Sequence, residues 1–313
     1  MKRFALILHY DGGPFHGWQL QQREQSTVQG ALEDVLERLT GVRRPVVGSG
    51  RTDRGVHAAG QVATVKLPPR WEAPELRRAL NALLPRSIWV EEVRQVPEAF
   101  HPRYHAVRRS YVYQVGLQRR VRSPFLRGAC WPLDGERLDP ELLAQAAALI
   151  PGDRSFRNFA KAGQPERGER CRVDAAGWSP WIGSAMGELE GGSILETGSL
   201  HPDEAQGAGQ AAAHVEAIGL RFTISANRYL HHMVRYLVGT MIEVARGGRP
   251  LEEMAELLTN PETSLVTSPP APPEGLFLAR VEYPSESWNG GPELPQDRDP
   301  PPPPSRQRST GTE

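Results

Sequence analysis

The chain has 313 residues, of which 39% are hydrophobic and 24% are charged, and its formal net charge is zero. This length can bury a core and hold two subdomains, and the apolar runs are shorter than the about 18–20 residues of a membrane span. Asp11 follows the first apolar run, where a secretory signal would have a cleavage site. The two cysteines, Cys130 and Cys171, lack paired ligand spacing and favour a reducing compartment. We therefore expect a cytoplasmic protein.

The first third of the chain predicts the order strand, helix, strand, strand, helix, strand. Residues 4–10 form an apolar run typical of a buried strand, and residues 28–39 carry apolar side chains at helical spacing after a capping Ser26 or Thr27. The remaining elements are expected as strands over 44–49, 61–67 and 88–96 and a helix that includes 76–83. This order is the ferredoxin-like arrangement.

The rest of the chain repeats this order less clearly. The pattern predicts strands over 111–117, 172–181, 218–225 and 275–283, a helix from Pro140, a long helix over 228–246 and a short helix over 251–258. Asn227 is expected to cap the long helix, and Gly247 and Gly248 to end it. The prediction is an α+β protein with two ferredoxin-like halves, residues 1–107 and 108–284, whose sheets join side by side around a basic cleft.

Two segments have compositions that do not support a packed core. Residues 183–213 are an acidic, glycine-rich insertion in the second half, and residues 285–313 are a polar tail with a proline run. Such segments cannot bury enough apolar surface to offset the entropy of ordering. We expect both to be disordered or mobile, and their composition indicates no function.

Positive charge is concentrated in residues 1–127, and nearly all of it comes from arginine. The densest basic stretch runs over 103–127. Arginine suits bidentate phosphate contacts, so this stretch favours a nucleic-acid partner. A solvated basic face would give the same pattern, and composition alone leaves both interpretations open.

A single carboxylate between two arginines is the strongest local feature. The string Gly-Ser-Gly-Arg-Thr-Asp-Arg-Gly-Val-His places Asp53 between Arg51 and Arg54, with glycines on both sides. Neighbouring positive charges lower a carboxyl pKa, and an ionised aspartate on a tight loop suits a nucleophile. The alternative to a nucleophile is a structural role, in which an Arg–Asp pair braces the turn. A dinucleotide site is rejected because Asp53 stands where the third glycine of that fingerprint belongs and would repel phosphate.

Two further segments carry chemically useful side chains. Tyr111 and Tyr113 share one face of a predicted strand, where a tyrosine can stack on a base or transfer a proton. On the helix predicted over 228–246, helical spacing gathers Arg228, His231, His232 and Arg235 on one side. Adjacent histidines on a helix diverge too far to chelate one ion well, so no metal site is expected.

These segments together resemble the TruA-type tRNA pseudouridine synthases. The motif from Gly50 to His57 is similar to the family's Gly-Arg-Thr-Asp-x-Gly-Val-His, and the segment at Tyr111 to its Arg-x-Tyr-x-Tyr. The helix segment is similar to its Phe-Leu-His-His-Met-Val-Arg, with Tyr229 in place of the phenylalanine. The resemblance spans residues 3–284, apart from the insertion. It implies the pseudouridine synthase fold and isomerisation of uridine at positions 38, 39 and 40 of the tRNA anticodon stem-loop.

The resemblance also implies roles for individual residues. Asp53 is the expected nucleophile, and Tyr111 is expected to stack on the uracil and act as the base for its C5 proton. Arg235 and Arg51 are expected to keep Asp53 ionised, with Arg51 also filling the space of the flipped base. Arg54 and His57 are expected to brace the loop or contact phosphate. The reaction is an isomerisation, so no cofactor is expected, and the family suggests a homodimer that shares one tRNA.

Two other functions are compatible with parts of this sequence. A non-catalytic RNA-binding module fits two ferredoxin-like halves around a basic cleft, although the strands lack the aromatic string of RNA-recognition modules. A carboxylate-based hydrolase could use Asp53 with His57, although the motif offers no second acid across the bond. The sequence does not indicate which of the three uridines is preferred, which tRNAs are modified, or whether the adduct forms on the base or the ribose.

Overall fold

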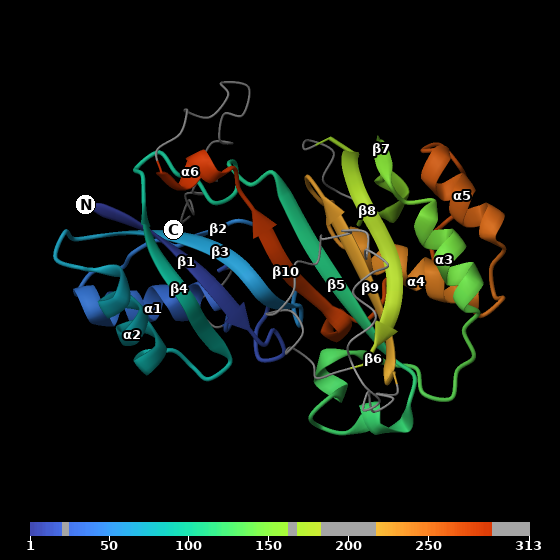
Figure 1. Ribbon diagram of the computed structural model, residues 1–313, viewed down its shortest axis with the longest axis horizontal. Helices are drawn as coiled ribbons and strands as arrows, with labels where there is room; N and C mark the ends of the chain where they lie inside the picture. The colour runs from blue at the N-terminus through green and yellow to red at the C-terminus, as the bar shows by residue number, and fades with distance from the viewer. Residues whose placement is uncertain (21–24, 162–167, 183–216, 290–313) are drawn as a thin grey trace, which may run out of the picture.

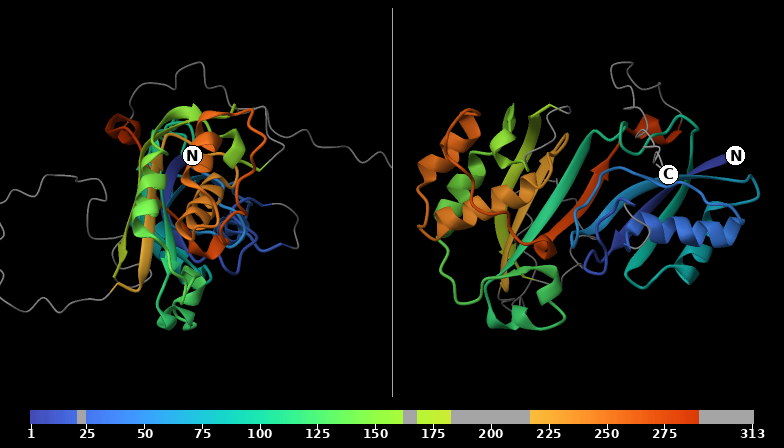
Figure 2. Two further views of the ribbon diagram at one scale, coloured as in Figure 1. Left: turned by 90° about the vertical axis from the view of Figure 1, so that its right-hand side faces the viewer. Right: turned by 180° about the vertical axis from the view of Figure 1, so that it is seen from behind.

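The computed structural model describes residues 1–20, 25–161, 168–182 and 217–289. Their strands form one ten-stranded sheet, with the main path β4-β1-β3-β10-β5-β9-β8-β7. Seen along the sheet edge, α1, α4 and α5 lie on the same side of the sheet (Figure 2). The mixed helices and strands confirm the predicted α+β class. The predicted division at residue 107 stays a prediction, and the insertion 183–213 lies outside the described residues.

The first half holds the six expected elements (Figure 1). They are β1 (Lys2–Tyr10), α1 (Val28–Thr40), β2 (Val47–Gly48), β3 (His57–Leu67), α2 (Ala73–Leu83) and β4 (Ile88–Val96). Thr27 caps α1, because its hydroxyl accepts the amide of Gly30. Strand β2 is shorter than the predicted 44–49, since Pro45 cannot donate a ladder hydrogen bond.

The second half contains more pieces than expected. Its strands are β5 (Arg108–Gly116), β6 (Trp131–Pro132), β7 (Gly152–Ser155), β8 (Arg170–Trp181), β9 (Gly219–Ala226) and β10 (Leu276–Glu282). Its helices are α3 (Pro140–Ala148), α4 (Met233–Ala245), α5 (Leu251–Thr259) and α6 (Ser285–Asn289). The prediction of a disordered tail from residue 285 is therefore wrong for α6. Trp288 supplies an apolar anchor there, stacking on Phe100 at 5.1 Å between ring centroids.

The two halves of the chain meet where β10 of the second half pairs with one edge of β3. The first strand of each half lies inside the sheet, with β1 between β3 and β4 and β5 between β9 and β10. Strand β10 pairs in parallel with the start of β3, at His57 and Ala58, while β2 takes the same edge further along. The joined halves form a continuous sheet rather than two separate ones. The start of β3, which directly follows the Asp53 motif, therefore lies at the junction.

One hydrophobic core connects both halves, with side chains from β1, β3, β5 and the helices packed together. No described helix is long and apolar enough to cross a membrane. Both cysteines are buried thiols, and burial raises the pKa of each to about 11. They pack as small apolar side chains and carry no thiolate at neutral pH.

The chain packs so closely against α4 at Gly239 that a side chain does not fit there. A Cβ atom there would lie 2.1 Å from the carbonyl oxygen of Pro269. Gly239→Ala should therefore lower the free energy of unfolding by at least about 2 kcal/mol, although alanine ordinarily favours a helix by about 1 kcal/mol. Urea denaturation measures the change. Gly177→Ala in β8 is the control, because its Cβ would meet no heavy atom within 4 Å. Equal stability of Gly239→Ala and the wild type would contradict this packing.

Candidate active site

The loop that carries Asp53 connects β2 to β3 and rests on the first half of the chain. The carbonyl of Thr52 accepts the amide of Trp18 at 3.0 Å, and the Thr52 hydroxyl lies 2.8 Å from the Tyr10 hydroxyl. Gly17 has φ 95°, and a Cβ there would lie 2.7 Å from the Thr52 carbonyl oxygen. These contacts fix the loop at the carbonyl and the side chain of Thr52. Asp53 therefore projects from a supported turn.

Cationic and imidazole side chains from the second half surround the Asp53 carboxylate. Nε2 of His231 lies 3.2 Å from Oδ1, and Nε2 of His232 lies 3.3 Å from Oδ2. Nη1 of Arg235 lies 3.9 Å from Oδ2. The Asp53 side chain remains 24% exposed, so a reactant can still reach it. Imidazole and guanidinium nitrogens therefore lie close to both oxygens of this carboxylate.

The histidine pair meets Asp53 because α4 begins at Met233, five residues later than predicted. His232 precedes the helix with φ 64°, in the left-handed region that residues other than glycine rarely adopt. The two imidazole centroids lie 4.1 Å apart. The prediction that the histidines diverge is wrong, because it assumed the helical step of about 100° per residue. Burial lowers the pKa of His232, and the negative charge of Asp53 opposes that shift.

Arg235 is held in place by the segment that packs along α4. Its Nε donates to the carbonyl of Ala271 at 2.6 Å, and the Ala271 amide donates back to the Arg235 carbonyl at 2.9 Å. The Arg235 side chain is 13% exposed. The tight approach of Pro269 to Gly239 belongs to the same segment. Core packing thus sets the position of the guanidinium beside Asp53.

Tyr111 lies on β5, within electrostatic reach of Asp53. It is 9% exposed, and its ring meets that of Tyr229 edge to face at 4.9 Å. Burial raises the pKa of Tyr111 to about 12, with Arg109 lowering it and the charge of Asp53 raising it further. Tyr113, on the same strand face, is fully buried and donates its hydroxyl to the carbonyl of Pro272 at 2.8 Å. Tyr113 is therefore a core residue.

Arg109 lies inside the basic stretch, yet its guanidinium binds backbone carbonyls. One Nη donates to Ser49 at 2.8 Å and to Arg103 at 2.9 Å, and the other donates to Asn227 at 3.2 Å. These bonds connect the loop before Asp53 to the ends of β5 and β9. This residue stabilises the junction, a role that its place in an arginine-rich stretch did not indicate.

The remaining motif residues divide into one buried and two exposed side chains. His57 is 5% exposed, stacks on Phe277 at 4.6 Å and accepts the Gly12 amide at Nδ1. An amide can only donate, so Nε2 carries the ring proton and donates to the carbonyl of Glu274 at 3.1 Å. Asp11, 3.2 Å from Nδ1, is then not a hydrogen-bond partner of that nitrogen. Arg51 and Arg54 flank Asp53 with exposed side chains.

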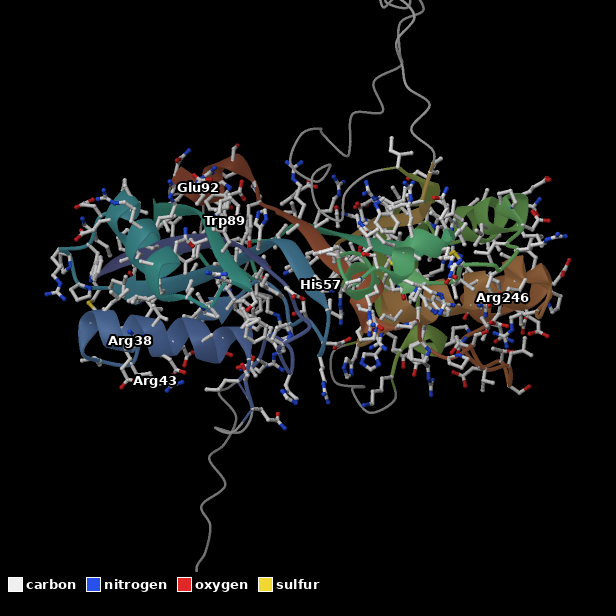
Figure 3. All side chains as sticks on the ribbon, turned by 90° about the horizontal axis from the view of Figure 1, so that it is seen from below. Arg38, Arg43, His57, Trp89, Glu92 and Arg246 are labelled. Carbon is white, nitrogen blue, oxygen red and sulfur yellow. The ribbon has the colours of Figure 1, made fainter. Side chains whose placement is uncertain are left out.

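The location of this cluster agrees with the topology. His57 lies between the blue and teal first half and the green and orange second half in Figure 3. The loop before β3 contributes Asp53, and the turn between β9 and α4 contributes the two histidines. Strand β5 adds Tyr111. The candidate site therefore combines residues distant in sequence at the β3–β10 junction.

Comparison with known proteins assigns the chain to a family. The model of the family described as tRNA pseudouridine synthase matches residues 6–105 and 146–284. The chain is a member of this family. It is 34% identical over 289 residues to tRNA pseudouridine synthase A of Cereibacter sphaeroides, covering 92% of this chain and all of the relative. It is 32% identical to the protein of that name from a Geobacter species, over 91% of this chain and all of that relative.

Membership makes the chain an isomerase that acts on uridine in tRNA. Asp53, Arg235 and Tyr111 were singled out from the sequence, and the structure brings Asp53 and Arg235 into contact. The sequence did not predict the contact of His231 and His232 with Asp53. The two histidines are adjacent in a cationic segment, and this pattern was interpreted as one face of a helix.

Proposed function

We propose that this pseudouridine synthase modifies positions 38, 39 and 40 in the anticodon stem-loop of tRNA. We further propose that Asp53 is the nucleophile and that Arg235 and Arg51 keep it ionised. Tyr111 stacks on the uracil and removes the proton from C5, while Arg54 and His57 support the loop. The cluster of His231, His232 and Arg235 around a single, partly exposed carboxylate is the observation that supports this proposal most strongly.

The reaction needs a nucleophile and proton transfers but no redox partner. The N1–C1′ bond of uridine breaks, the uracil turns, and C5 bonds to C1′. The C5 proton leaves and N1 acquires a proton, so the product is an isomer of the substrate. The target carbon is stacked inside the stem, so the nucleotide must flip out at a cost of about a few kcal/mol. We assign the filling of the vacated space to Arg51, which is exposed and lies two residues before Asp53.

Mapping pseudouridine in tRNA after incubation with the purified protein tests the proposed positions. The substrates are transcripts with uridine at one of positions 38, 39 or 40 and cytidine at the other two. Each should be converted at its single uridine, and a transcript with no uridine in this region should remain unmodified. Conversion only at sites outside the anticodon stem-loop would overturn the positional assignment while leaving the family activity intact.

Release of label from C5-tritiated uridine in tRNA distinguishes catalysis from the alternative of a non-catalytic RNA-binding module. An enzyme releases tritium at every turnover, because the C5–H bond must break. A binding module retains the tRNA and releases none. Replacing tRNA with free uridine or uridine monophosphate should stop release, because the synthase requires tRNA. A small-molecule hydrolase would instead liberate uracil from these compounds without releasing tritium.

Salt dependence should identify the arginines that contact the tRNA backbone. Arg119 and Arg127 are exposed in the 3-10 turns Arg119–Arg122 and Arg127–Ala129. Each phosphate contact contributes about 0.7–0.9 to the slope of log affinity against log salt. The double variant Arg119→Gln, Arg127→Gln should reduce this slope by about 1–2 in a filter-binding titration. Arg38→Gln on the outer part of α1 (Figure 3) is the control and should not change it. If the double variant has the same slope as the Arg38→Gln control, Arg119 and Arg127 do not contact the tRNA backbone.

We also infer, from the family resemblance, that two copies of the chain act on one tRNA. Analytical ultracentrifugation of the full chain measures the assembly directly. A dimer at micromolar concentration is expected. A monomer that retains full turnover would contradict the inference without affecting the proposed chemistry.

A further inference from the structure

The side chains that surround Asp53 also offer a set of metal ligands. One ligand atom from each of Asp53, His231 and His232 lies within 4.8 Å of the others. Each imidazole Nε2 lies beside a different oxygen of the same carboxylate, at 3.2 Å from Oδ1 for His231 and 3.3 Å from Oδ2 for His232. We propose that these three residues bind one divalent first-row transition ion, which inhibits the enzyme reversibly by occupying Asp53.

The donor types determine which ions fit. Two imidazoles and one carboxylate suit zinc, cobalt or iron in the divalent state, whereas magnesium and calcium prefer oxygen ligands. Three protein ligands leave room for water at a fourth position. The side chains of His231 and His232 are 35% and 19% exposed, so an ion can enter from solvent. The left-handed backbone at His232 brings the two rings to the same side of Asp53.

Binding places an ion among the three ligand atoms and changes no oxidation state. Each Nε2 that now faces a carboxylate oxygen would present its lone pair to the ion, and the single proton of each neutral imidazole would reside on Nδ1. The Asp53 oxygen that coordinates the ion is then unable to attack carbon.

Arg235 opposes the ion. Its guanidinium lies 3.9 Å from Oδ2 of Asp53 and is anchored on Ala271, so it remains close when an ion enters. Like charges repel, and the repulsion weakens binding. The proposed function assigns Arg235 the opposite effect on catalysis. Removing this guanidinium should therefore reduce turnover and strengthen metal binding, a pair of results that general loss of structure cannot produce.

Titration of the full chain with cobalt, without a histidine tag, tests the site by the visible absorption of protein-bound Co²⁺. We expect saturation at one ion per chain and displacement by Zn²⁺. His231→Asn and His232→Asn should each weaken binding at least about tenfold, and asparagine tolerates the left-handed backbone at His232. Arg235→Gln should tighten binding at least about threefold. His9→Asn is the matched control, since His9 meets Glu91 through Nε2 at 3.1 Å in a pair with one imidazole.

Several outcomes would overturn the proposal. They are the absence of a saturable cobalt site, equal affinity in wild type and both histidine variants, or weaker binding by Arg235→Gln. The inhibition itself rests on the proposed function and is measured separately, as loss of tritium release with Zn²⁺, recovery with chelator and no loss with Mg²⁺. A protein that binds cobalt through these residues but releases no tritium would refute the function and retain the site. Turnover unaffected by saturating Zn²⁺ would refute the inhibition.

Discussion

Asp53→Asn should reduce pseudouridine formation by at least about 10³-fold while tRNA binding remains largely intact. An amide has the shape of the carboxylate, but it is neutral and a poor nucleophile. The surrounding His231, His232 and Arg235 would also lose the negative charge that they face. Tritium release from C5-labelled tRNA measures turnover, and filter binding measures affinity.

Two controls make this experiment decisive. Asp53→Ala cannot return to aspartate by deamidation, so it shows whether residual activity comes from reversion. Asp139→Asn applies the same chemical change at the N-cap of α3, where asparagine caps about as well, and it should retain full turnover. Normal tritium release by both Asp53 variants would rule out this residue as the nucleophile.

Tyr111→Phe should slow turnover by about 10²–10⁴-fold, the usual contribution of a positioned acid or base, with little change in tRNA affinity. The ring is retained, so stacking survives and only the hydroxyl is lost. Burial raises the pKa of Tyr111 to about 12, which makes its phenolate rare at neutral pH. A rate that depends on this phenolate should rise about tenfold per pH unit below that pKa, and this dependence should vanish in Tyr111→Phe.

The groups that face Tyr111 bear on that pH profile. Arg109 carries a guanidinium, which keeps its proton in proteins throughout this range, so it does not produce a rising limb. Tyr113→Phe is the matched control, since it removes a buried hydroxyl from the same strand face. It should reduce stability by about 1–3 kcal/mol, because the Pro272 carbonyl loses its donor, without altering the profile. A wild-type rate in Tyr111→Phe would eliminate the general-base role and leave stacking.

Much of the fold follows from local patterns in the chain. Alternating and continuous apolar runs marked β1, β4 and β9 to within two residues, and Thr27 and Pro140 marked two helix starts. These features depend on side chains a few residues apart, so periodicity and capping chemistry suffice to locate them. The loop that carries Asp53 was equally clear, because glycines and charges of opposite sign occur together over a short span.

Other features depend on contacts between distant segments. The start of α4 was misplaced because the left-handed turn at His232 runs against local helix propensity. The turn is supported from outside the helix, where the Lys161 amide donates to the His231 carbonyl at 3.0 Å. Likewise, α6 forms where composition indicated disorder, because Trp288 packs against Phe100 and Tyr283.

The sequence by itself determined the α+β class and the order of the elements in the first half, and it marked Asp53 as the candidate nucleophile, since each rests on residues close together in the chain. Only the tertiary structure decided that β10 pairs with the start of β3 and that His231, His232 and Arg235 converge on that carboxylate. The physical reason is that these contacts join residues from different halves of the chain. Sheet pairing and core packing set the geometry of these contacts, and a pattern of neighbouring residues does not predict it.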